Sequence, residues 1–226
     1  MRIAVFSDVH GNLPALEAVI GDAGEVDGYV CLGDVVNYGP WSDECVDVVA
    51  ALKNSVYLAG NHEVAFSTGA YPGTNPIARA FFDHCYPAFT RQDIIRDLPT
   101  TAELYGFEFR HTIDDRYVYP DSVLTLTADS VIGHSHHQFV VEDSGFRLVN
   151  PGSVGQNRRY INIANYLLLE TDTMTFEPRA LRHDIDLVIA EMRRRDYPEE
   201  CLAYYESKER WITSDPLPGF RPFSAN

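Results

Sequence analysis

The chain has 226 residues, of which 45% are hydrophobic and 12% aromatic, and its formal net charge is −15. A chain of this length buries a sizeable core and suits one domain, with or without a small cap. Its strong acidity argues against non-specific binding to nucleic acids or membranes, because both require clustered Lys and Arg. We therefore expect neither a membrane nor a non-specific nucleic-acid partner.

The composition also bears on location. No apolar run approaches the ~20 residues that span a bilayer, and the run Ile3–Phe6 is too short for the core of a signal peptide. The four cysteines are scattered without a CxxC pair, which favours reduced packing residues over disulfides or a zinc ribbon. A cytoplasmic protein is the expectation.

The first sixty residues alternate between predicted strands and helices. Strands are expected at residues 3–6, 29–32 and 55–59, since each is a short apolar run. A helix with Asn12 as its N-cap separates the first two, and a second helix capped by Ser42 precedes the third. This alternation implies right-handed crossovers and parallel pairing of the three strands, hence an α/β fold.

The rest of the chain divides into a helical and a strand-rich part. Residues 64–100 read as a helical cap insertion, with one helix beginning at Asn75-Pro76 and a short one beginning near Thr90. Residues 184–210 form two closing helices, and we expect one domain over residues 1–226. Between these helical parts, strands are predicted at 104–110, 123–132, 138–142, 146–149, 165–171 and 174–181.

Metal-ligand chemistry follows four of the predicted strands. In open α/β sheets, ligands bind just beyond the carboxyl ends of the strands. Side chains at i and i+2 of an extended backbone point to the same side, so a DxH or HxH pair presents two ligands together. Each element alone is a weak signal, but four in order indicate a metal site. They are Asp8-Val9-His10, Gly33-Asp34, Gly60-Asn61-His62-Glu63 and Gly133-His134-Ser135-His136.

These four motifs resemble those of the calcineurin-like metallophosphoesterase superfamily. Tyr38-Gly39-Pro40 and the stretch Asn150–Gly155 resemble, more narrowly, its small prokaryotic phosphodiesterase branch. The similarity runs from about residue 2 to residue 170. It implies a four-layer αββα sandwich of the metallo-dependent phosphatase type, which suits the strand-rich second half better than a purely parallel sheet does.

The resemblance also implies a role for each motif residue. His62 would be the catalytic histidine that protonates the leaving oxygen, and a hydroxide bridging the metals would be the nucleophile. Asp34 would bridge the two metals. The first metal would take Asp8, His10, Asp34 and His136, and the second would take Asp34, Asn61, His111 and His134.

Several assignments stay open at this point. His111 lacks the glycine that usually follows its counterpart, but it ends an apolar run and is expected to be a ligand. Arg158 could bind a substrate phosphate or belong to a solvated pair with Arg159. Asn37 is a hypothetical substrate contact, with loop structure as the alternative. His84 reads as a helix-surface residue, and His137 and His183 as ordinary exposed residues.

The predicted function is metal-dependent hydrolysis of phosphate esters. The substrate would be a small organic phosphate or a nucleotide, and the enzyme a phosphodiesterase or phosphomonoesterase. Asn37-Tyr38-Gly39 lacks the arginine of the DRG tripeptide found in protein phosphatases and symmetrical dinucleotide hydrolases, which disfavours both. The alternative is a non-catalytic scaffold on the same fold, which His62 argues against.

The predicted cofactors are two divalent metal ions. A mixed nitrogen and oxygen ligand set with four histidines suits Mn²⁺, Fe²⁺ or Zn²⁺. The resemblance favours Mn²⁺.

Overall fold

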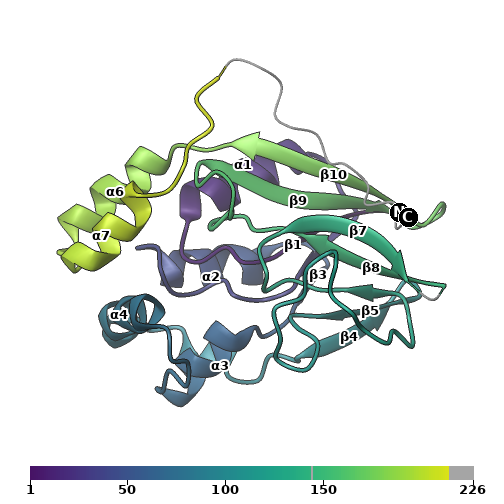
Figure 1. The fold of residues 1–226 in the computed structure, drawn as a ribbon, viewed down its shortest axis with the longest axis horizontal. Helices are drawn as coiled ribbons and strands as arrows, with labels where there is room; N and C mark the ends of the chain where they lie inside the picture. The colour runs from purple at the N-terminus through teal and green to yellow at the C-terminus, as the bar shows by residue number, and fades with distance from the viewer. Residues whose placement is uncertain (144, 214–226) are drawn as a thin grey trace.

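Two five-stranded mixed sheets lie face to face in the computed structural model, which describes residues 1–143 and 145–213 (Figure 1). The first sheet has the order β10-β9-β1-β2-β3. Its strands are β1 (Arg2–Phe6), β2 (Gly28–Cys31), β3 (Ser55–Tyr57), β9 (Ile163–Glu170) and β10 (Thr175–Arg182). The second sheet has the order β4-β5-β6-β8-β7. Its strands are β4 (Thr101–Leu104), β5 (Phe107–Arg110), β6 (Ser130–Val131), β7 (Gln138–Asp143) and β8 (Phe146–Pro151).

Helices cover the outer face of the first sheet. They are α1 (Leu13–Ala23), α2 (Ser42–Ala51), α3 (Asn61–Thr68), α4 (Pro76–Cys85), α5 (Gln92–Ile95), α6 (Ile185–Arg194) and α7 (Glu199–Glu206), with a 3₁₀ turn at Tyr86–Ala88. As predicted, β1, β2 and β3 pair in parallel, with α1 and α2 as the crossovers. Helix α4 from the middle of the chain contacts α7 from its end, and α6 contacts α7.

Alternation along β1 explains why the molecule forms a sandwich. Ala4 and Phe6 belong to the core beneath the helices, whereas Ile3 and Val5 belong to a second core between the two sheets. A strand buried on both faces reads as a continuous apolar run, as β1 does. The expected α/β sandwich is thus confirmed, and the chain folds around two cores that share the first sheet.

The outer face of the second sheet has a different cover. Ile132, Phe139 and Leu148 are buried there against Val118 and Leu126, which come from the irregular segment 111–129. This segment therefore belongs to the fold, and it leads from the end of β5 to β6.

Three sequence predictions of elements were wrong. Residues 104–110 are not one strand, because Tyr105 and Gly106 have φ values of 52° and 77° and turn the chain from β4 into β5. Positive φ at both central residues is typical of a two-residue hairpin turn. Residues 123–132 form only the two-residue strand β6. Helix α3 was not predicted, because its polar first turn was assigned to the end of a strand.

Smaller predictions can also be judged. All four cysteines are free and buried, as expected. Asn12 caps α1 by accepting a hydrogen bond from the Ala15 backbone N–H, whereas α2 has Trp41 at its N-cap in place of Ser42. Among the described helices, none is long and apolar enough to cross a bilayer.

Candidate metal centre

The motif residues lie in tight turns directly after the strands. Asp8, His10, Asp34, His134 and His136 all have positive φ, between 50° and 67°. Such φ values cost non-glycine residues free energy, on the order of 1–3 kcal/mol each, and persist where the surrounding structure enforces them. The expected extended i, i+2 arrangement is therefore wrong, since left-handed turns bring these side chains together.

Two glycines make room for these turns. Gly33 has φ +103°, and a Cβ atom there would lie 2.2 Å from the Gly60 backbone nitrogen. A Cβ atom on Gly60 would lie 2.2 Å from Asp34 Oδ1. Because both contacts are far shorter than van der Waals distance, only glycine allows the second and third motifs to meet.

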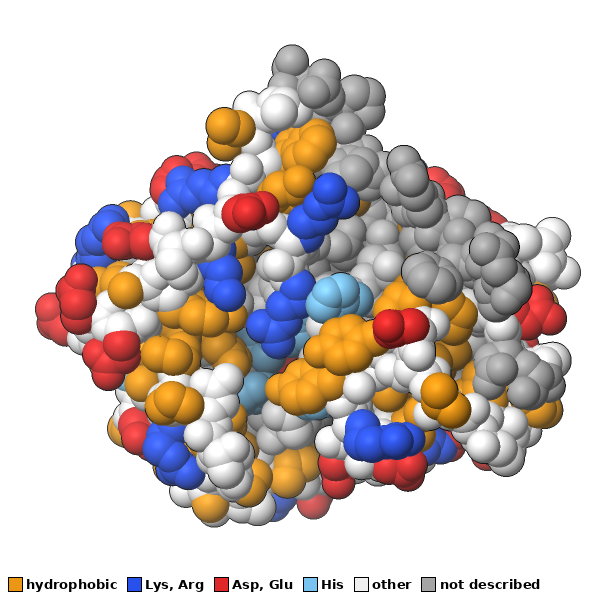
Figure 2. All heavy atoms as spheres, in the orientation of Figure 1, with side chains coloured by type: hydrophobic (Ala, Val, Ile, Leu, Met, Phe, Trp, Pro, Cys, Tyr) orange, Lys and Arg blue, Asp and Glu red, His pale blue; other side chains and the backbone are white. Residues whose placement is uncertain are grey.

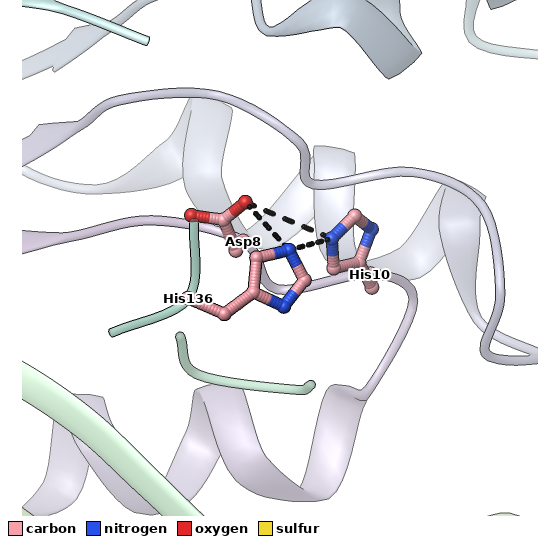
Figure 3. Close-up of side chains that lie close together, drawn as sticks. All are labelled: Asp8, His10 and His136. Atoms are coloured by element: carbon pink, nitrogen blue, oxygen red, sulfur yellow. Dashed lines mark hydrogen bonds and ion pairs between the residues drawn. The ribbon is translucent and has the colours of Figure 1, made fainter. Parts of the chain in front are cut away.

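Asp8, His10 and His136 form the first cluster (Figure 3). Asp8 Oδ1 lies 3.2 Å from His136 Nε2 and 3.7 Å from His10 Nε2. The two Nε2 atoms are 3.2 Å apart. All three side chains are buried, so the carboxylate and both imidazoles converge on one point inside the protein.

Asp34 belongs to two further clusters, one with His111 and His134 and one with His10 and His62. Its Oδ2 lies 3.0 Å from His111 Nε2 and 4.0 Å from His10 Nε2. Its Oδ1 accepts a hydrogen bond of 2.9 Å from the His62 backbone N–H. Asp34 thus stands between the residues of the two predicted ligand sets.

Backbone carbonyls fix the tautomers of three imidazoles. The Nδ1 atoms of His10, His111 and His136 lie 3.3, 3.0 and 2.7 Å from the carbonyl oxygens of Val36, Leu32 and Gln156. A carbonyl oxygen can only accept, so each Nδ1 carries a proton, and each Nε2 presents a lone pair when its imidazole is neutral.

These lone pairs face one another and the carboxylates. Asp8 Oδ1 and His111 Nε2 are buried and have no hydrogen-bond partner of good geometry. Lone pairs on the Nε2 atoms of His10 and His136, 3.2 Å apart, repel unless a cation lies between them. Neutral imidazoles held by a second hydrogen bond, together with carboxylates, are a donor set that suits divalent transition metals.

The carboxylates and the imidazoles shift one another's pKa values. Burial acts to raise the pKa of Asp34, but His111 and His62 outweigh it and hold the pKa well below its usual range. Burial acts to lower the pKa of His111, yet the Asp34 carboxylate raises it to about 9. Burial lowers the pKa of His134 to about 4. Asp34 is therefore ionised at neutral pH, and the site carries the negative charge that a cation requires.

His62 is held by Asn37. The Asn37 amide nitrogen lies 3.0 Å from His62 Nδ1, and both side chains are buried. With the amide as donor, the Nδ1 atom accepts, so the proton of neutral His62 resides on Nε2. The Asn37 side chain thus lies against His62, and its hypothetical contact with substrate stays a prediction.

Two other predicted site residues are exposed to solvent. Asn61 is the exposed first residue of α3, and its side chain makes no hydrogen bond within the described part of the chain. Arg158 is also exposed and has no ion-pair partner among residues 1–143 and 145–213. Its charge acts to lower the pKa values of Tyr38 and Tyr117.

The histidines outside the predicted site were expected at the surface, and the structure shows that they differ in solvent exposure. His137 is exposed as predicted. His84 is half-buried, and its ring lies against that of Tyr197 with centroids 4.0 Å apart. His183 is also largely buried, with Nε2 3.1 Å from the Ile161 carbonyl oxygen, so the prediction that it is exposed was wrong.

Glu63 is a residue whose role the sequence analysis missed. Its buried carboxylate accepts hydrogen bonds from the backbone N–H groups of Asp34, Val35, Val36 and Gly60. It thereby ties the turn after β2 to the start of α3. The signal was present, since Glu63 is the third residue of a helix that follows Gly60, the position of a capping glutamate.

Asn150 and Ser153 support the remaining turns. The Asn150 amide donates to the Gly133 carbonyl oxygen at 2.8 Å, beside His134. The Ser153 hydroxyl donates to the Asp8 carbonyl oxygen at 2.7 Å. Both residues therefore act on the backbone of the ligand-bearing turns and not on the imidazole rings.

The site opens to the surface. Figure 2 shows pale-blue histidine side chains at the bottom of a hollow, with orange hydrophobic and blue cationic side chains along its edge. A buried, anionic group of ligands below an open hollow can hold cations and still admit a small molecule.

Comparison with known proteins agrees with this arrangement. The model of the calcineurin-like phosphoesterase family matches residues 1–190. The chain is 28% identical, over 87% of its length and 94% of the relative, to protein MJ0912 of Methanocaldococcus jannaschii. It also resembles a metallophosphoesterase from Sphaerobacter thermophilus, with 26% identity, a TM-score of 0.77 and coverage of 92% of this chain and 98% of the other.

A further solved structure shares the fold. Protein PH1004 of Pyrococcus horikoshii superimposes with a TM-score of 0.77 at 17% identity, over 90% of this chain and 97% of its own. Fold, family and site agree, and the chain belongs to the calcineurin-like phosphoesterase family. It is a metal-dependent phosphoesterase, as the sequence predicted.

Proposed function

We propose that the protein hydrolyses small organic phosphate esters with two divalent metal ions that share Asp34. The observation that carries the proposal is that Asp34 shares one cluster with His111 and His134 and another with His10, which in turn clusters with Asp8 and His136. By this proposal Asp8, His10 and His136 hold the first ion with Asp34, and His111 and His134 hold the second. Asn61 completes the second set, and its amide oxygen would bind without adding charge.

When bound, the metal pair supplies positive charge for the phosphate oxygens and activates a water for in-line attack. His62 lies beside Asp34 but outside both ligand sets, and we assign it the proton for the leaving oxygen. Burial lowers the pKa of His62, whereas the Asp34 carboxylate acts to raise it. A phosphate anion next to the ring would raise the pKa further, so that substrate binding itself favours the protonated imidazole.

Asn37 contributes by orienting the imidazole ring of His62. An amide donor at His62 Nδ1 keeps the ring in one plane and directs Nε2 away from the loop. Tyr71, from the proposed cap 64–100, lies nearly parallel to the His62 ring, with ring centroids 6.2 Å apart. Both contacts restrict the imidazole before substrate arrives, and a pre-oriented acid reduces the entropy lost at the transition state.

Sequence and chemistry together support proposals for the metal, a substrate contact, the domain organisation and the location. Mn²⁺ is the proposed native metal, with Fe²⁺ and Zn²⁺ as alternatives. Arg158 is proposed to bind the substrate phosphate, because the molecule is otherwise strongly acidic and an exposed guanidinium near the site would attract an anion.

We also propose one domain for the whole chain. A cytoplasmic location is proposed as well, since four free cysteines suit a reducing compartment.

The test is hydrolysis by protein that has been stripped of metal and reloaded with Mn²⁺. A chromogenic phosphodiester and the matching monoester are compared, and their ratio assigns the enzyme to one activity. His62→Ala should lose at least about 100-fold in kcat while retaining bound metal, since general acid catalysis contributes ~10²–10⁴-fold. His137→Ala, an exposed histidine outside the clusters, is the matched control.

The outcomes separate enzyme from scaffold. Metal-dependent turnover that His62→Ala abolishes supports the proposal. Two bound metals without turnover, with Mn²⁺, Fe²⁺ or Zn²⁺ and with esters of several sizes, would instead favour a non-catalytic scaffold.

A further inference from the structure

A tyrosine ring contacts each of three site histidines. Tyr38 meets His10 edge to face, with ring centroids 4.8 Å apart. Tyr71 lies nearly parallel to His62 at 6.2 Å, and Tyr117 stacks on His134 at 4.1 Å with 21° between the rings. The rings come from three separate segments of the chain. We call Tyr38, Tyr71 and Tyr117 together the aromatic wall of the site.

Tyr117 is the exposed member of this wall. It lies in segment 111–129 and is 56% exposed, although one face covers His134. Its opposite face is therefore open to solvent. An aromatic ring held flat by a stacking partner, with its second face free, is a preformed surface for another planar group.

Tyr71 lies at the same site as Tyr117 although it comes from the proposed cap. Tyr71 faces His62 and Tyr117 faces His134, and each of these histidines shares a cluster with Asp34, so both tyrosines lie around the same carboxylate. The guanidinium of Arg79 lies 5.3 Å from the centre of the Tyr71 ring and donates to the Tyr71 carbonyl oxygen at 2.8 Å. Arg79 thus contacts both the ring and the backbone of Tyr71.

We propose that Tyr117 and Tyr71 form a base-binding rim, so that the preferred substrate carries a nucleoside base beside the scissile phosphate. This inference rests on the proposed function, because it requires the phosphate to sit at His62 and the metal ligands. Bases stack on aromatic side chains with little regard for sequence, since every base has a π face. The rim would therefore select nucleotides as a class and not one base.

The chemistry of the rim favours a base over other groups. An alkyl phosphate offers no flat face to Tyr117, and a sugar phosphate offers only C–H groups. Stacking also needs no charge, which matters because the chain is strongly acidic and has few cations to spare for binding. Arg158 is exposed, has no ion-pair partner among the described residues and remains free for the phosphate.

The experiment uses substrate pairs that differ only in the base. Adenosine 5′-phosphate is compared with ribose 5-phosphate, and the methyl diester of each is compared in the same way, on the Mn²⁺-loaded full-length protein. The selectivity is the ratio of kcat/KM for the base-bearing ester to that for its partner. Adenosine without phosphate is added as a competitor, and its inhibition constant measures binding to the rim alone.

Tyr117→Ala should lower this selectivity about tenfold, which corresponds to about 1.4 kcal/mol, and should weaken adenosine inhibition similarly. Tyr117→Phe should keep both, because the ring remains. Tyr119→Ala is the matched control, since Tyr119 lies in the same segment, is 39% exposed and packs on His137 outside the site. It should keep the selectivity of the wild type.

Failure of the base-binding rim and failure of the proposed function give different experimental results. Equal kcat/KM for both members of each pair, or a Tyr117→Ala selectivity equal to that of the wild type, would overturn the rim while leaving phosphoester hydrolysis intact. Absence of metal-dependent turnover on all four esters would contradict the proposed function itself. Tm values of the variants confirm that each is folded.

Discussion

At the scale of single residues, the turns after the strands carry most of the strain and most of the chemistry. Asp8, His10, Asp34, His134 and His136 have positive φ, which non-glycine residues avoid. The identity of these residues could be predicted, because ligand chemistry is local in sequence. Their left-handed backbone could not, because it is imposed by contacts between motifs far apart in the chain.

Glu63 illustrates how these turns are enforced. Replacing Glu63 by Ala leaves the buried N–H groups of Asp34, Val35, Val36 and Gly60 without an acceptor. We predict a loss of roughly 3–5 kcal/mol in the free energy of unfolding, since each buried unpaired group costs ~1–3 kcal/mol. Urea titration measures it, with the exposed Glu17→Gln as control. A loss below ~1 kcal/mol would show that the turn stands without this carboxylate.

His183 predicts a pH dependence of stability. Burial lowers its pKa from the ordinary 6.5 to about 4 in the folded protein. Between these values the unfolded chain binds the extra proton, so stability is full above about pH 6.5 and falls as the pH drops toward 4. The loss attributable to His183 should reach roughly 2–3 kcal/mol.

The comparison of wild type with His183→Gln isolates this residue from the other histidines. Denaturation midpoints are measured at several pH values from 7 down to about 4. The variant should lose less stability over this range than the wild type. Parallel pH curves for the two proteins would mean that His183 is protonated equally in the folded and unfolded states.

At the scale of elements, periodicity identified the helices and strands whose packing is regular. The first β-α-β-α-β unit was predicted because its apolar runs and helical stripes are continuous. The β4–β5 hairpin was missed, because Tyr105-Gly106 interrupts an otherwise apolar segment by only two residues. Helix α3 was missed because its first turn, which includes Asn61 and His62, is polar. It lacks the apolar stripe by which an amphipathic helix is recognised in a sequence.

Helix α4 is the element on which the cap depends. Its N-cap Asn75 accepts hydrogen bonds from the backbone N–H groups of Ile77 and Ala78. Asn75→Ala should cost ~1 kcal/mol, the usual value of such a cap. Because Asn75 is exposed, the substitution removes little else.

Limited proteolysis and thermal unfolding measure the effect of Asn75→Ala. We expect faster cleavage within residues 64–100, a lower Tm, or both, relative to Thr74→Ala at the exposed neighbouring position. A variant that matched Thr74→Ala in both assays would show that α4 is held by its packing on α7 alone.

At the scale of the whole molecule, the pairing of two sheets could be anticipated only through resemblance. The order β4-β5-β6-β8-β7 joins parallel and antiparallel pairs, and strand β6 has two residues, so no local pattern specifies it. The clustering of the motif histidines and aspartates could also be predicted, since the motifs follow the strand ends, and their role as metal ligands stays a proposal. The aromatic wall could not be predicted, because Tyr71 and Tyr117 reach His62 and His134 only in the folded chain.

The net charge of −15 gives a prediction for the whole molecule. Excess like charge destabilises a compact state, and salt screens it by reducing the Debye length from about 10 Å at ~0.1 M to about 3 Å at ~1 M. Tm should therefore rise with sodium chloride, by about 2–4 °C for each kcal/mol gained. Sucrose at equal osmolality is the control, and a Tm that fell with salt would show that attractive ion pairs outweigh the repulsion.

The central claim is that Asp34 serves two metal ions at once, and metal counting tests it most directly. Protein loaded with Mn²⁺ is dialysed and its metal content is measured for the wild type, Asp34→Ala and Asp8→Ala. We predict two ions for each wild-type chain, loss of both in Asp34→Ala and retention of one in Asp8→Ala. A single ion in the wild type, or two ions retained in Asp34→Ala, would contradict the account.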